Sequence, residues 1–76
     1  MISVEVVTVR RGSTGPAVKR LQALLAANFG QTVTVDGNYG PQTSTGVLNV
    51  QRFFGMTADD VVGPQTWGII LSQPPS

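Results

Sequence analysis

Three Gly-Pro steps limit what this chain of 76 residues can fold into. They stand at residues 15–16, 40–41 and 63–64, and each opens a segment with helical periodicity. Proline is favoured at the first position of a helix, where its missing N–H has no intrahelical partner, and glycine before it permits a sharp turn. Two of the steps extend to the same tetrapeptide, GPQT. We interpret the repeat as one kind of helix start that is used three times.

The three helices that follow these steps have apolar stripes at helical spacing. The first is predicted from Pro16 to about Asn28, with Gly30 as a left-handed residue that closes it. The second is predicted from Pro41 to a stop at Gly55, and the third from Pro64. The residues expected to face inward are Val18, Leu21, Leu25, Thr43, Val47, Val50, Phe54, Trp67, Ile70 and Leu71.

The remaining segments are predicted to be extended. Alternating residues from Ile2 to Val9 indicate a short strand or arm within residues 1–12. Two short linkers, Gln31–Val35 and Val61–Val62, join the helices, and Val33 and Val35 are expected to point inward. The sequence therefore predicts an all-α, compact three-helix bundle with a short N-terminal extended arm and two short extended linkers. We expect one domain over residues 1–76, with residues 73–76 as a C-terminal tail.

The composition excludes several classes of function. A net charge of +1 gives no electrostatic basis for binding nucleic acid or an anionic membrane. The chain has neither histidine nor cysteine, so it has no imidazole base, thiol nucleophile, disulfide or conventional zinc set. A calcium loop beginning at Asp36 would need glycine and glutamate where Pro41 and Val47 stand. We therefore expect no metal, no cofactor and no catalytic residues. The start of the chain has no basic leader typical of a signal peptide.

Three segments carry a family likeness. They are RRGSTGPAVKRLQALL (10–25), VDGNYGPQTSTGVLNVQRF (35–53) and VVGPQTWGIIL (61–71). In order and spacing they resemble the peptidoglycan-binding domain, the non-catalytic three-helix module of bacterial and phage cell-wall hydrolases. The chain differs from that family's usual pattern at Gly46 and Val50, where alanine and phenylalanine are common, and at Asp60, where glycine is common.

The resemblance suggests that the loop before the second helix contacts the ligand, so we assign candidate binding roles to Asp36, Asn38 and Tyr39. Asp36 could accept hydrogen bonds from sugar hydroxyls or stem-peptide amides, or only cap its own turn. Tyr39 could stack on a sugar face, or be a core anchor. Arg52 could pair with a stem-peptide carboxylate, or be a solvated charge. Trp67 is either a ligand platform or part of the core.

The resemblance implies a function without catalysis. We expect a monomer that binds bacterial peptidoglycan, through its glycan strand or stem peptide, and so concentrates a linked or partner hydrolase near its substrate. The expected location is extracellular or at the cell wall, and the resemblance is compatible with a phage-encoded origin. The alternative is a structural or protein-interaction module of a phage particle or secreted assembly, which keeps the fold without binding glycan.

Overall fold

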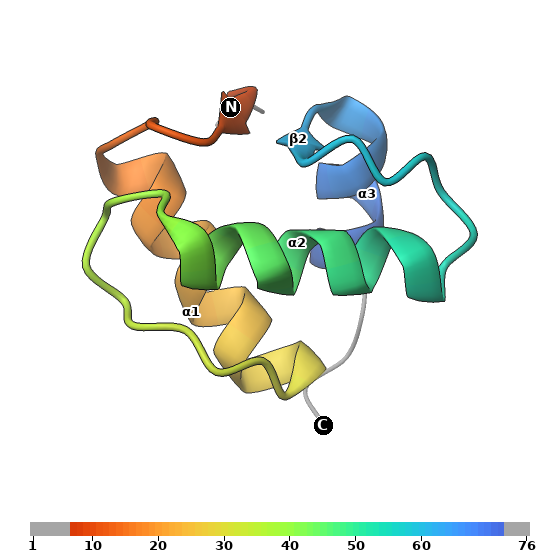
Figure 1. Ribbon diagram of the computed structural model, residues 1–76, viewed down its shortest axis with the longest axis horizontal. Coiled ribbons are helices and arrows are strands. Elements are labelled where there is room, and N and C mark those ends of the chain that lie inside the picture. Colours follow the sequence, from red (N-terminus) through yellow and green to blue (C-terminus); the bar gives the residue numbers. More distant parts are fainter. Residues whose placement is uncertain (1–6, 73–76) are drawn as a thin grey trace, which may run out of the picture.

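The computed structural model describes residues 7–72, which form three helices and a two-stranded sheet (Figure 1). The helices are α1 (Pro16–Phe29), α2 (Pro41–Phe53) and α3 (Pro64–Ser72). Strands β1 (Val9–Arg10) and β2 (Val61–Val62) pair antiparallel. The predicted three-helix bundle is confirmed, and the sheet is a minor addition to it.

The extended segments are only partly as predicted. Of the strand expected over residues 2–9, Val9 lies in β1, Val7 and Thr8 form no strand, and residues 2–6 lie outside the described part of the chain. The predicted tail at 73–76 also lies outside it. The linker at 31–35 forms no strand, whereas Val61–Val62 is β2.

All three Gly-Pro steps are helix starts. The carbonyls of Gly15, Gly40 and Gly63 accept hydrogen bonds from the amides four residues later, at 3.1, 2.9 and 2.9 Å. Each proline is the first residue of its helix, where its missing donor has no cost. Gly15 has a φ of 114°, a conformation that other residues rarely adopt. The predicted left-handed end of α1 is also present, because Gly30 has a φ of 64°.

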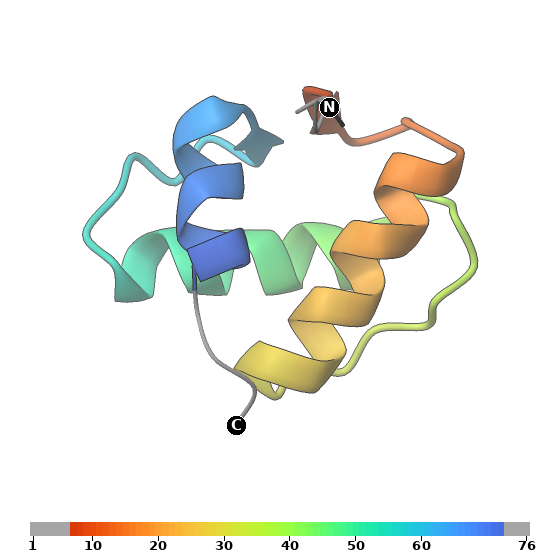
Figure 2. The same ribbon diagram turned by 180° about the vertical axis from the view of Figure 1, so that it is seen from behind.

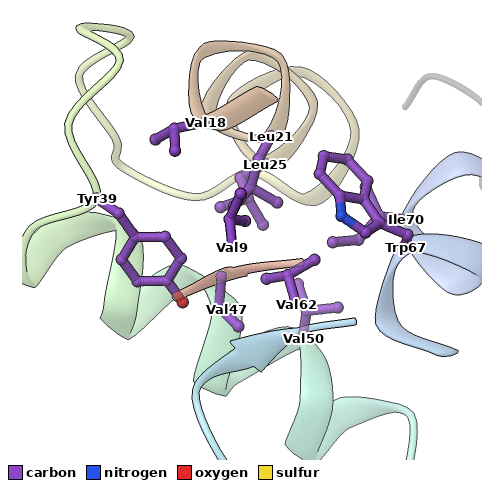
Figure 3. Close-up of a cluster of buried hydrophobic side chains, with 10 residues drawn as sticks. All are labelled: Val9, Val18, Leu21, Leu25, Tyr39, Val47, Val50, Val62, Trp67 and Ile70. Carbon is purple, nitrogen blue, oxygen red and sulfur yellow. The ribbon is translucent and has the colours of Figure 1, made fainter. Parts of the chain in front are cut away.

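The core lies where the three helices and the sheet meet (Figures 1 and 2). Its buried apolar side chains, drawn in Figure 3, are Val9, Val18, Leu21, Leu25, Tyr39, Val47, Val50, Val62, Trp67 and Ile70. Two inward predictions are wrong: Val35 is 43% exposed and Leu71 is 39% exposed. In α3 the core side is taken by Trp67 and Ile70, and Leu71 stands about 100° further round the helix. Val35 lies in a segment with no strand partner to fix its orientation.

Gly46, which departs from the family pattern, lies where α2 contacts both α1 and the connection before α2. A Cβ atom at this position would lie 3.3 Å from Leu25 Cδ1 and 3.4 Å from Val33 Cγ2, both tight contacts. Residue 46 is buried despite having no side chain. The glycine therefore allows the connection between α1 and α2 to run close to the surface of α2.

Candidate functional site

A buried glutamine holds the connection between α1 and α2 in place. Gln22, on α1, is 1% exposed, and its amide nitrogen donates to Asp36 Oδ1, the Asn38 carbonyl and Thr43 Oγ1 at 2.8–3.0 Å. Its amide oxygen accepts from the backbone N–H groups of Asp36 and Gly37 at 2.9 and 2.8 Å. One side chain therefore makes five hydrogen bonds and fixes both the loop and the first turn of α2.

A second buried glutamine repeats this arrangement between α2 and α3. The amide nitrogen of Gln51 donates to Asp59 Oδ1, the Val61 carbonyl and Thr66 Oγ1 at 3.1–3.3 Å. Its oxygen accepts from the Asp60 N–H at 3.2 Å. The partners correspond one for one, since DGNYGPQT (36–43) and DDVVGPQT (59–66) share five residues in register. The internal repeat is thus a complete junction: a helical glutamine, an aspartate turn and a Gly-Pro helix start.

The two junctions differ in how far the preceding helix continues. After Gln22, α1 runs on for seven residues, or about 10 Å, whereas α2 ends two residues after Gln51. The chain must therefore travel back along α1 to reach Gln22 again. This returning segment runs beside α2 before entering it (yellow-green in Figure 1). Two amide contacts tie it to α2: Thr34 N–H donates to Gln42 Oε1 at 3.1 Å, and Asn49 Nδ2 donates to Gln31 Oε1 at 3.0 Å.

Two hollows lie between the returning segment and α2, and we call them together the α2 groove. Their volumes are about 290 and 390 Å³, and Gln42 lines both. Amide and hydroxyl side chains predominate in the lining. The polar lining residues are Gln22, Gln31, Thr32, Thr34, Asp36, Asn38, Gln42, Thr43, Thr45 and Asn49. Such a surface suits an uncharged ligand that has many hydrogen-bonding groups.

Asp36 and Asn38 present free polar atoms at one end of the α2 groove. Asp36 Oδ1 accepts from Gln22 and from the Asn38 N–H, whereas Oδ2 makes no hydrogen bond within residues 7–72. The Asn38 N–H and then Gln22 lower the pKa of the Asp36 carboxyl, so it stays ionised in mildly acidic conditions. The Asn38 side-chain amide is exposed and has no partner in this part of the chain. Both residues predicted for ligand contact are thus accessible in the groove.

Tyr39 and Trp67 are core residues, so the expectation that they contact ligand is corrected. They are 3% and 4% exposed, and both rings lie inside the cluster of Figure 3. The Tyr39 hydroxyl donates to Asp60 Oδ1 at 2.6 Å, and Trp67 Nε1 donates to the Val7 carbonyl at 2.8 Å. Neither ring has a face free for a sugar. The alternative interpretation of each, a core anchor, is the one that the structure supports.

Arg52, the remaining predicted residue, is exposed in the last turn of α2 and does not line either hollow. A cation there interacts favourably with the helix dipole. The sequence analysis missed Gln22 and the wall formed by Gln31 to Thr34. The aligned aspartates at 36 and 59 were a usable signal, because the same turn at both junctions implies the same support beneath it.

The burial of Tyr39 makes a prediction at alkaline pH. Burial, followed by the hydrogen bond to Asp60, raises the pKa of Tyr39 far above its ordinary value of about 10. The phenol ionises first in the unfolded chain, so its contribution is constant below about pH 10 and is lost as the pH rises further. We expect the free energy of unfolding to fall above that pH, and less steeply in Tyr39→Phe. Tyr39 is the only tyrosine, so tyrosinate absorbance should rise together with unfolding. Ionisation while the chain is still folded would contradict this burial.

The described residues offer no metal site and no membrane span. No group of three or more acidic side chains that could hold a metal ion occurs within residues 7–72. No helix in the same range has both the length and the apolar character needed to cross a bilayer. The polar chemistry that the structure brings together is therefore that of the α2 groove.

Comparisons with known proteins agree with this architecture. Residues 14–70 match the family described as "Putative peptidoglycan binding domain". The chain is 37% identical over 65 residues to a zinc D-Ala-D-Ala carboxypeptidase of Streptomyces albus G, covering 83% of this chain and 26% of that enzyme. It spans less than half of the length of each curated relative that it matches here.

Solved structures show the same likeness in three dimensions. A fused Zn-dependent amidase/peptidase/peptidoglycan-binding domain-containing protein of Clostridium acetobutylicum superposes with a TM-score of 0.85 at 30% identity, covering 95% of this chain and 32% of that one. The endolysin of Burkholderia phage AP3 superposes with a TM-score of 0.82 at 33% identity, covering 87% of this chain and 25% of that one. The family match covers most of the chain and its helices recur in these structures, so the chain belongs to the peptidoglycan-binding domain family.

Proposed function

We propose that this domain is a non-catalytic anchor that binds bacterial peptidoglycan through the α2 groove. The observation that carries the proposal is the groove itself, an open channel lined by amides and hydroxyls with an unpaired Asp36 oxygen at one end. Peptidoglycan is rich in acetamido, hydroxyl and peptide groups, which pair with such a lining. Family membership supports the same polymer as ligand.

The anchoring mechanism is an increase in local concentration. A weak contact repeated along a polymer keeps a tethered partner near its substrate. The relatives include a carboxypeptidase and an amidase of which this chain covers only a fraction, which supports a hydrolase as the tethered partner. The proposed site of action is the cell wall, and the endolysin likeness supports a phage-encoded origin as one source. We propose that the domain binds as a monomer.

The absence of catalysis in this domain is supported by its residues. The sequence has no histidine or cysteine, and a hydrolytic site would have to use two of its four acidic side chains. Asp59 and Asp60 each accept hydrogen bonds within the fold, from Gln51 and from Tyr39 and Ser44. Asp36 stands at the groove with its pKa lowered, which suits an acceptor and not a general acid.

The internal repeat supplies a matched control for the groove. Gln42 and Gln65 are equivalent exposed residues of the two GPQT copies, but only Gln42 lines the hollows. We expect the double substitution of Asn38 and Gln42 by alanine to weaken binding to insoluble sacculi about tenfold, because each amide contributes about 1 kcal/mol. Gln65→Ala should bind like the wild type. Sedimentation at increasing sacculus concentration measures both.

The outcome separates the proposal from its alternative. Circular dichroism should show that all variants keep the same helical content, because the three amides are exposed. If the wild-type domain does not sediment with sacculi, the peptidoglycan anchor is wrong, and recovery of a protein partner instead would favour an interaction module. Equal loss in the groove variant and in Gln65→Ala would remove the groove from the binding site.

A further inference from the structure

The three phenylalanines of the chain meet at the C-terminal ends of α1 and α2. Phe54 contacts Phe29 edge to face, with ring centroids 6.2 Å apart, and contacts Phe53 in the same way at 5.0 Å. Phe29 and Phe54 are partly buried and pack against the core, whereas Phe53 is 82% exposed. The core therefore supports Phe54, and Phe54 supports a ring whose own surface faces solvent.

Phe53 continues the face of α2 that lines the groove. Gln42, Thr45, Asn49 and Phe53 are separated by three, four and four residues, so they lie in one row on the helix. The first three line the hollows, and Phe53 stands one turn beyond Asn49. Eleven residues of helix make the row about 16 Å long. A ligand lying along the groove would thus pass from the polar end to the exposed ring.

The charges of the groove oppose one component of peptidoglycan. Among the described residues that line it, Asp36 is the charged one and no lysine or arginine is present. The free carboxylates of a stem peptide would meet a like charge there and no compensating cation. A glycan strand has acetamido and hydroxyl groups that pair with amides, and apolar sugar faces that stack on an aromatic ring.

We infer that the α2 groove binds the glycan strand of peptidoglycan, not the stem peptide, and that Phe53 is the platform on which a sugar ring stacks. The inference rests on the proposed function and goes further by naming the ligand component and an additional contact residue. Arg52, next to Phe53 in sequence, points about 100° away around α2 and lies outside the row. It provides the matched test of the competing stem-peptide interaction.

The experiment compares three ligands. They are intact sacculi, glycan strands stripped of peptide by an amidase, and free stem peptides. We expect the wild-type domain to bind sacculi and stripped strands. Phe53→Ala should weaken both about fivefold, as expected for the loss of one aromatic contact, and Phe53→Trp should retain binding. Arg52→Gln and Leu71→Ala, a change at another exposed apolar residue, should leave binding unchanged.

Each contrary result has a distinct meaning. Binding to sacculi and stem peptides but not to stripped strands, with a loss in Arg52→Gln, would overturn the glycan inference and leave the proposed function intact. Unchanged binding by Phe53→Ala, together with loss of a concentration-dependent dimer, would assign the ring to self-association and also overturn it. No binding of the wild type to sacculi would contradict the proposed function itself.

Discussion

Replacing Gln22 by leucine is expected to lower the free energy of unfolding by about 4 kcal/mol, although the two side chains are similar in size. The leucine would leave the Gly37 N–H and Thr43 Oγ1 without their partner in a buried setting. Each unpaired buried group costs about 1–3 kcal/mol. A domain of this length has a total stability of about 4–11 kcal/mol, so the variant should be close to unfolded at room temperature. Urea denaturation followed by circular dichroism measures the loss.

Two further variants identify the cause of that loss. Gln22→Glu keeps the shape but replaces the amide donor by an oxygen that faces Asp36 Oδ1 and the Asn38 carbonyl, so it should also be strongly destabilised at neutral pH. Gln51→Leu removes four longer bonds at the second junction and should cost less, about 3 kcal/mol. If Gln22→Glu were as stable as the wild type, packing would account for the role of Gln22 and its hydrogen bonds would not.

The helices could be predicted from the sequence because their signals are local. Each Gly-Pro step fixes a start within one residue, and the end of α1 follows from Gly30. The stripe of Val18, Leu21 and Leu25 is correct for the same reason, since helical spacing alone decides which side faces the core.

The candidate site could be predicted only in part because its remaining contacts are long-range. Asp36 and Asn38 lie in a recognisable turn, so their exposure followed from the sequence. Tyr39, in the same segment, is buried because Asp60 accepts its hydroxyl proton from a distant loop. Gln22 is buried because the chain returns to it after fourteen residues, and no local pattern marks that return.

The repeat shows how one junction acquired a surface for binding. Both copies spend their glutamine and aspartate on holding a turn, so these residues do not by themselves imply a ligand. The first copy differs because α1 overshoots Gln22, and the returning chain then forms a wall beside α2. Where that wall has Asn38 exposed, the second copy has Val61 in the sheet. The ligand surface therefore arises from helix length and not from the repeated motif.

Asp60 joins the two junctions and has a backbone conformation that suits glycine. Its φ is 61°, and it is the only non-glycine residue within 7–72 with a positive φ. The equivalent residue of the first junction is Gly37, with a φ of 79°. The Asp60 carboxylate accepts hydrogen bonds from the Tyr39 hydroxyl at 2.6 Å and the Ser44 hydroxyl at 2.5 Å. This departure from the family pattern thus combines an unfavourable backbone with two favourable side-chain contacts.

Substitutions at Asp60 should separate these two effects. Asp60→Ala removes both contacts and keeps the left-handed backbone, so we expect a loss of about 3 kcal/mol in the free energy of unfolding. Asp60→Gly removes the same contacts but tolerates the backbone, so its loss should be smaller by about 1 kcal/mol. Asp60→Asn keeps one acceptor oxygen and should be the mildest change. Thermal and urea unfolding of the three variants give the order. A glycine variant more stable than the wild type would mean that the backbone strain outweighs both hydrogen bonds, and the carboxylate would then no longer explain why aspartate occupies a position suited to glycine.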